Sequence, residues 1–139
     1  TIENAINLFK KNLPDSLFYR CGSQLGPAVV MTDNSYAERN ALSFCWPNSV
    51  RLLCVFHVLQ ALWRWLYDSK YKIYKDDCVL IMQLFKKVLY VPTISEMEIL
   101  FFDLKESYFT KYTQLAIHLS HLWKRRTSWA LAYHQNLLI

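Results

Sequence analysis

The chain has 139 residues, of which 53% are hydrophobic and 19% charged, and its formal net charge is +5. This composition is typical of a folded globular protein with a sizeable core and excludes an intrinsically disordered one. Only two glycines and four prolines are present, too few for the many tight turns of a β-sandwich, so helices are favoured.

The apolar segments are too short or too interrupted to predict a membrane span. The longest, residues 52–67, contains His57, Gln60 and Arg64 and is shorter than the ~20 residues that a span needs. We also find no signal-peptide pattern at the N-terminus. Four cysteines in such a chain indicate reduced thiols and an intracellular protein: Cys21, Cys45, Cys54 and Cys78.

The first half alternates helical and strand patterns. Apolar spacing predicts a helix over residues 2–12, a loop over 15–27 and, from a β-branched run, a buried strand over 28–31. Ser35 and Glu38 form a capping-box pattern, which predicts a helix ending near Cys45. A second strand over 49–55 and a helix over 56–67, with Trp63 in the core, complete a strand-helix-strand-helix order. This order predicts a parallel strand pair with a right-handed crossover.

The second half has helical patterns only. We predict helices over 76–90, over 93–107 after a second capping box, and over 110–133. The fold class is therefore α/β in the first half, all-α in the second, and predominantly helical overall. We place the boundary between the two regions at 68/69, which gives regions 1–68 and 69–139.

Asp33 is the first candidate site residue, because it follows a predicted strand and precedes a predicted helix. In an open α/β sheet, ligands gather beyond the carboxyl ends of the strands. The common structural role of Asp here is an Asx turn or N-cap. Since Asn34 and Ser35 can cap the helix, we expect Asp33 to be left for another role, such as binding Mg²⁺ or Mn²⁺.

Cys54 and His57 form a second candidate pair, three residues apart where the second strand becomes a helix. A zinc site would need two further ligands, which His118 and His121 could supply. A buried thiol and a hydrogen-bonded histidine are the structural alternative. A Cys-x2-His pair by itself is a weak predictor of zinc. Cys45 and Cys78 are the substitutes for the histidines in such a site.

Basic and aromatic residues alternate after the second strand, a pattern that suits single-stranded or distorted nucleic acid. A solvated helix face is the alternative interpretation of each basic run. The aromatic members are Trp65, Tyr67, Tyr71 and Tyr74, with Trp63 assigned to the core. The candidate nucleic-acid contacts are Arg64, Lys70, Lys72, Lys75, Lys124, Arg125 and Arg126.

Several blocks occur in a fixed order over residues 26–67. They are Thr32–Ser35 with Glu38–Leu42, then Trp46–Pro47, then Leu52–Ala61 with Trp63–Leu66. Together they resemble the Mutator-like element (MULE) transposase domain. Residues 122–126 and 129–131 are also similar to that family's pattern, more weakly.

The resemblance implies an RNase H-like fold whose catalytic sheet is interrupted by an all-α insertion. Such transposases hold two Mg²⁺ or Mn²⁺ ions with a DDE triad of acids, and they cleave and join DNA at transposon ends in the nucleus. Asp33 matches the second acid of the triad. Cys54 and His57 match the Cys/Asp-x2-His motif that follows it.

The resemblance also implies that the other two acids of the triad lie outside these 139 residues. We therefore expect an internal part of a transposase that is inactive by itself, with a homo-oligomer compatible with its many aromatics. The acids of the helical half predict a solvated face: Glu96, Glu98, Asp103 and Glu106. Two alternatives stay open. They are a transposase-derived nucleic-acid-binding or scaffolding protein, and a zinc-stabilised helical interaction module using Cys54, His57, His118 and His121.

Overall fold

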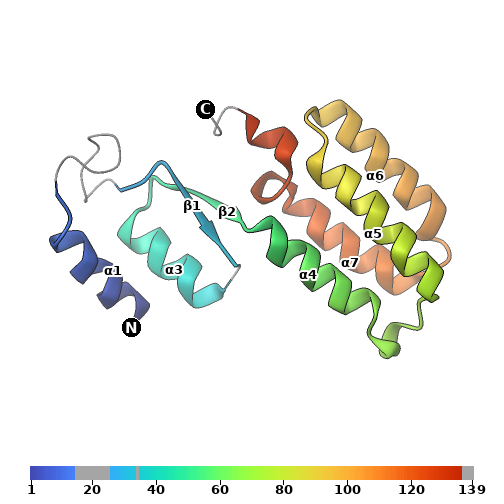
Figure 1. Cartoon of the computed structure of the whole chain (residues 1–139), viewed down its shortest axis with the longest axis horizontal. Helices are drawn as coiled ribbons and strands as arrows, with labels where there is room; N and C mark the ends of the chain where they lie inside the picture. The colour runs from blue at the N-terminus through green and yellow to red at the C-terminus, as the bar shows by residue number, and fades with distance from the viewer. Residues whose placement is uncertain (15–25, 34, 136–139) are drawn as a thin grey trace. The chain divides into compact units, whose positions relative to one another are not determined.

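The computed structural model describes residues 1–14, 26–33 and 35–135. The described residues divide into two compact units, Thr1–Cys54 and Val55–Ile139. Most of the predicted loop over 15–27 lies outside the described residues, and so does Cys21. Figure 1 shows the elements of both units in chain order.

The first unit contains two helices and a two-stranded parallel sheet. Helix α1 (Ile2–Lys11) packs against α3 (Tyr36–Cys45), and β1 (Val29–Thr32) pairs with β2 (Val50–Leu53). The pairing register runs from Val29 opposite Val50 to Thr32 opposite Leu53. The predicted helices, strands and parallel pairing are confirmed, with bounds shifted by one or two residues. This part of the molecule is a mixed α/β unit.

The junction between α3 and β2 is held by a buried cation. Lys10 is only 9% exposed, and its Nζ donates to the carbonyl oxygen of Cys45 at 2.9 Å. The same ammonium lies 6.0 Å from the centroid of the Trp46 ring. A Cβ at Gly26, where φ is +75°, would lie 2.4 Å from that ring. Trp46 therefore requires a glycine at position 26, because an added methyl group would overlap the indole.

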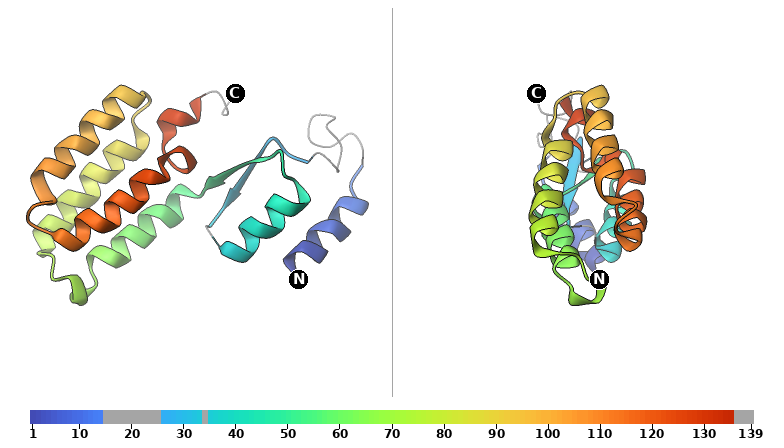
Figure 2. Two further views of the ribbon diagram at one scale, coloured as in Figure 1. Left: turned by 180° about the vertical axis from the view of Figure 1, so that it is seen from behind. Right: turned by 90° about the vertical axis from the view of Figure 1, so that its right-hand side faces the viewer.

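The second unit is made of helices that run up and down. Its α-helices are α4 (Val55–Leu66), α5 (Lys75–Tyr90), α6 (Ile94–Tyr108) and α7 (Thr113–Lys124). Three short 3-10 helices accompany them: η1 (Ser69–Tyr71), η2 (Arg126–Ser128) and η3 (Leu131–Tyr133). Helix α5 packs against α4, α6 and η3, and α6 also packs against α7 (Figures 1 and 2). The all-α character predicted for this half is confirmed.

Trp129 is one of the fully buried residues of the helical unit. It is 1% exposed, its ring centroid lies 5.2 Å from that of Phe85, and its Nε1 donates to the carbonyl oxygen of Leu122 at 3.0 Å. A buried indole N–H needs such a partner. Fully buried apolar side chains on each α-helix form the rest of the core: Leu62, Leu66, Ile81, Val88, Leu89, Met97, Leu104, Leu115 and Leu119.

Two expectations about the helices differ from the structure. The single helix predicted over 110–133 is wrong, because α7 ends at Lys124 and the chain continues through η2 and η3. The chain changes direction where α7 ends, and this places Trp129 in the core of the helical unit. A helix that continued straight to residue 133 would carry Trp129 away from that core. In addition, the compact units divide at Cys54/Val55. Helix α4 therefore packs with the helical unit, although we expected it in the first region.

Trp63 is a further correction. It was predicted to lie in the core but is 47% exposed, and it contacts Tyr67 with a centroid separation of 4.1 Å. The buried face of α4 is formed by Val58, Leu62 and Leu66. These three follow an i, i+4, i+8 spacing, so Trp63 falls beside the buried stripe rather than within it. Among the described helices, none has the length and apolar character needed to cross a membrane.

Trp129→Ala is expected to lower the free energy of unfolding by about 3–5 kcal/mol, because it leaves a cavity and removes a buried ring contact. Urea unfolding followed by far-UV circular dichroism measures this change. Phe102→Ala is the matched control, since Phe102 is 58% exposed on α6. The control is expected to change stability by less than about 1 kcal/mol. Equal losses in both variants would contradict the central role of Trp129.

Candidate functional site

Asp33 lies at the carboxyl edge of the parallel sheet. It directly follows β1, and the backbone N–H of Cys54, directly after β2, donates to the carbonyl oxygen of Thr32 at 2.7 Å. The two strand ends are therefore side by side. Thr32 is buried whereas Asp33 is exposed, so the strand holds the backbone while the carboxylate reaches solvent.

The side chain of Asp33 also has a local structural role. Its Oδ1 accepts the backbone N–H of Ser35 at 2.9 Å, which forms an Asx turn ahead of α3. Ser35 in turn caps α3, since its Oγ accepts the N–H of Glu38 at 3.5 Å. Our expectation that Asn34 and Ser35 leave Asp33 without a capping role is wrong for this oxygen. Asp33 takes the N–H that the glutamate of a capping box would take.

Glu38 is a residue that sequence reasoning did not connect with Asp33. Partial burial, a hydrogen bond to the Asp33 carboxyl and its charge raise the pKa of Glu38 above its usual value. The available sequence signal was the separation of five residues between Asp33 and Glu38. This separation places Glu38 on the first turn of α3, facing the end of β1. Two hard oxygen donors thus meet at the edge of the sheet.

The proposed zinc ligands lie in different local settings. Cys54 is half-buried after β2, whereas His57 is exposed on the first turn of α4. His118 stacks on Trp65, with ring centroids 4.4 Å apart and planes inclined by 10°, and His121 is exposed. In the part of the chain that the structure describes, no three or more His, Cys, Asp or Glu side chains are grouped to hold a metal ion.

Trp65 is the centre of an aromatic stack that joins α4, η1 and α7. One neighbour is Tyr71, at 4.1 Å between centroids and 21° between planes, and the other is His118. Burial, followed by the charges of His121 and Arg125, lowers the pKa of His118 below its ordinary value. The neutral imidazole is therefore the form that suits this stack.

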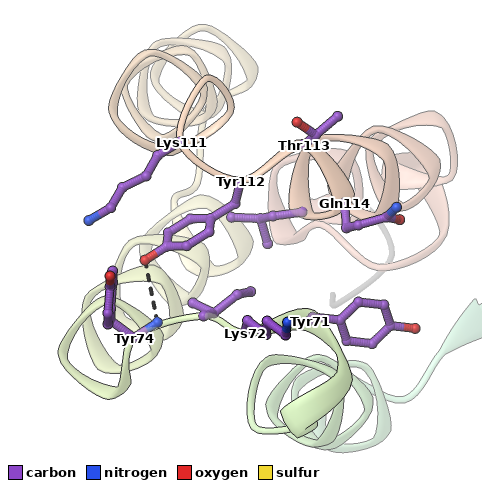
Figure 3. A pocket seen from close by; sticks show the side chains of 9 residues that line it. Tyr71, Lys72, Tyr74, Lys111, Tyr112, Thr113 and Gln114 are labelled. Atoms are coloured by element: carbon purple, nitrogen blue, oxygen red, sulfur yellow. Dashed lines mark hydrogen bonds between the residues drawn. The ribbon is translucent and has the colours of Figure 1, made fainter.

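A cavity of about 620 Å³ opens beside the stack. It lies between the segment joining α4 to α5 and the start of α7 (Figure 3). The candidate nucleic-acid contact Lys72 lines it, and so do the predicted aromatic residues Tyr71 and Tyr74. The remaining lining residues are Ile73, Lys111, Tyr112, Thr113, Gln114 and Leu115. No carboxylate is among the described residues that line this cavity.

Lys111 and Tyr112 are anchored at the cavity by Asp77 of α5. Lys111 Nζ lies 2.7 Å from Asp77 Oδ2, and the Tyr112 hydroxyl donates to the same oxygen. The Tyr112 hydroxyl also accepts the backbone N–H of Tyr74 at 3.4 Å, drawn as the dashed line in Figure 3. Hydrogen bonds from Lys111 and Tyr112 lower the pKa of Asp77 below its usual value. The Asp77 carboxylate and the Tyr112 hydroxyl thereby tie the two chain segments together.

Sequence reasoning missed Lys111 and Tyr112 because they lie about forty residues after the basic and aromatic series. Their adjacency just before a helical pattern was the only local indication. Lys72 adds a backbone feature, since its φ is +52°. Lys72 is the C-cap of η1, and its N–H donates to the carbonyl oxygen of Ser69, a position where the left-handed conformation is common.

The other predicted nucleic-acid contacts fall into two groups. Arg64, Lys70, Lys75, Lys124 and Arg125 are exposed. Arg126 is half-buried instead. Its guanidinium carbon lies 4.6 Å from the Trp123 ring centroid, and its Nε donates to the Tyr133 hydroxyl at 3.1 Å. Arg126 therefore holds the segment after α7 against the helical unit.

The comparisons with known proteins identify no relative. No family model, curated protein or solved structure matches the chain.

His118 is expected to make the stability of the helical unit depend on pH. Because its folded-state pKa is lowered, the unfolded chain binds a proton more readily than the folded chain as pH falls below about 6.5. Stability is therefore expected to decrease between pH 7.5 and pH 5. Urea unfolding at both values should show a smaller decrease for His118→Phe, which preserves a ring for stacking. His57→Phe, at an exposed position, should keep the full decrease.

Proposed function

We propose that the chain is part of the RNase H-like catalytic region of a Mutator-like DDE transposase, in which Asp33 supplies one carboxylate ligand to a divalent metal ion. The observation that carries this proposal is the position of Asp33 at the carboxyl end of β1, beside the end of β2. Chemistry in open α/β sheets is located at this edge. The block pattern over residues 26–67 supplies the choice of family.

The donor set at this edge fits Mg²⁺ or Mn²⁺. These ions prefer oxygen ligands and commonly use one or two carboxylates together with water and substrate phosphates. Asp33 and Glu38 provide two carboxyl groups in contact, and a divalent cation would relieve the repulsion between them when both are ionised. The hydrogen bond from Ser35 N–H to Asp33 Oδ1 fixes the orientation of the carboxylate before a metal binds.

When bound, such metal ions activate a water or 3′-hydroxyl nucleophile and stabilise the leaving oxygen of a phosphodiester. The contribution of this chain is a held carboxylate at the edge of the sheet. Two metals need more acidic ligands than Asp33 and Glu38 supply, so we expect no DNA cleavage by this chain alone. In the intact transposase, the partners are transposon-end DNA and other copies of the protein, in the nucleus.

Asp33→Asn is expected to weaken Mn²⁺ binding at least about tenfold, as measured by isothermal titration calorimetry or by the electron paramagnetic resonance of free Mn²⁺. The asparagine amide oxygen can still accept the N–H of Ser35, so the turn before α3 should persist. Glu38→Gln should weaken binding by a smaller factor. Circular dichroism spectra of both variants verify that the fold is retained.

Asp103→Asn is the matched control, because Asp103 is an exposed carboxylate on α6. It should bind Mn²⁺ like the unchanged protein. If the unchanged protein binds no Mn²⁺, or if Asp33→Asn and Asp103→Asn behave alike, the metal-binding role of Asp33 is wrong. A transposase-derived binding protein, in which Asp33 serves only as a turn residue, would then be the better account.

A further inference from the structure

We propose that the cavity between residues 71–74 and 111–115 binds single-stranded nucleic acid. Separate phosphates of one strand would contact Lys72 and Lys111, and a neighbouring base would stack on Tyr74. This inference goes beyond the proposed function and does not involve Asp33. It uses the proposed function in one respect only, which is the choice of DNA as the nucleic acid to test.

The charge and size of the cavity favour an anionic ligand. Its volume of about 620 Å³ is within the range of small-molecule and cofactor sites. Two lysines line it, without a carboxylate among the described lining residues. Lys111 has a half-exposed side chain and gives one of its three N–H donors to Asp77. Its remaining donors are available to a phosphate, although the ion pair with Asp77 competes for the ammonium.

The start of α7 adds further donors to the lining of the cavity. Its N-cap residue, Tyr112, makes no side-chain capping hydrogen bond, because its hydroxyl is directed toward Asp77 and the Tyr74 backbone. The first backbone N–H groups of the helix therefore have no cap from this residue. Thr113 and Gln114, which carry two of them, line the cavity. Such groups complement the lysines in binding an anion.

The aromatic rings favour nucleic acid over other anionic ligands. Tyr74 is 70% exposed, and Lys111 Nζ lies 5.2 Å from its ring centroid. A cation beside an exposed ring matches a nucleotide, which carries a phosphate and a flat base. Bases of a duplex are stacked inside the helix and cannot use this ring. Phosphopeptide sites are typically built from arginine clusters, and no arginine is among the described residues that line the cavity.

The test is fluorescence anisotropy of a labelled single-stranded DNA oligonucleotide with the full chain, in EDTA to remove divalent metal ions. Lys111→Gln and Lys72→Asn should each weaken binding several-fold and reduce the salt dependence, since each removes about one phosphate contact. Asparagine is chosen at position 72 because it tolerates the left-handed conformation. Tyr74→Ala should weaken binding about tenfold through loss of one stacked base.

Asp77→Asn is expected to increase the affinity for single-stranded DNA, whereas the three variants above are expected to decrease it. Removal of the carboxylate releases Lys111 from its ion pair, so single-stranded DNA should bind more tightly. Asparagine keeps an acceptor for the Tyr112 hydroxyl. Lys86→Gln is the matched control, because Lys86 is exposed on α5 and does not line the cavity. This control should leave the affinity unchanged.

Several results would overturn the inference. They are the absence of single-strand binding, tighter binding of the matched duplex, tighter binding of a phosphotyrosine peptide, and equal losses in Lys86→Gln and the cavity variants. Because EDTA removes Mn²⁺, a failure here is independent of the metal-binding result for Asp33. The two proposals can therefore fail separately.

Discussion

The pairing of β1 with β2 is the constraint on which the candidate metal-binding edge depends. Parallel strands cannot be joined by a tight turn, so the chain between them must cross over, and α3 forms that crossover. The same geometry places both carboxyl ends at one edge, where the Cys54 N–H contacts the Thr32 carbonyl oxygen. Asp33 and the first turn of α3 then meet at this edge, which brings Glu38 to Asp33. Loss of the parallel pairing would separate these groups.

In the helical unit, the position of the cavity depends on the alternating direction of successive helices. Helices α5 and α6 have 16 and 15 residues, or about 24 and 22 Å at 1.5 Å per residue. Because they pack together and are nearly equal in length, the segment before α5 and the segment after α6 lie at the same end of the unit. Tyr74 and Tyr112 thus become neighbours although 38 residues separate them. The cavity follows from this arrangement.

Local patterns in the sequence were sufficient for the elements but not for the sites. The capping residues Ser35 and Thr93 and the β-branched run before Asp33 predicted where elements begin, because these effects act within a few residues. Trp63 was misplaced because it adjoins the apolar stripe of α4, and the register of the buried face is decided by neighbouring helices. Lys111, Tyr112 and Asp77 come together only through tertiary packing. The RNase H-like fold and the transposase function remain predictions.

Asp33 and Asp77 illustrate how similar residues favour different ligands. Each lies at the start of a helix, where a negative charge is stabilised by the helix dipole. Asp77 is paired with the ammonium of Lys111, so its charge is balanced, and Lys111 keeps N–H donors that the pair does not use. Asp33 contacts another carboxyl group, that of Glu38, so negative charge accumulates when both are ionised. The first arrangement favours an anion such as a phosphate, and the second favours a divalent cation.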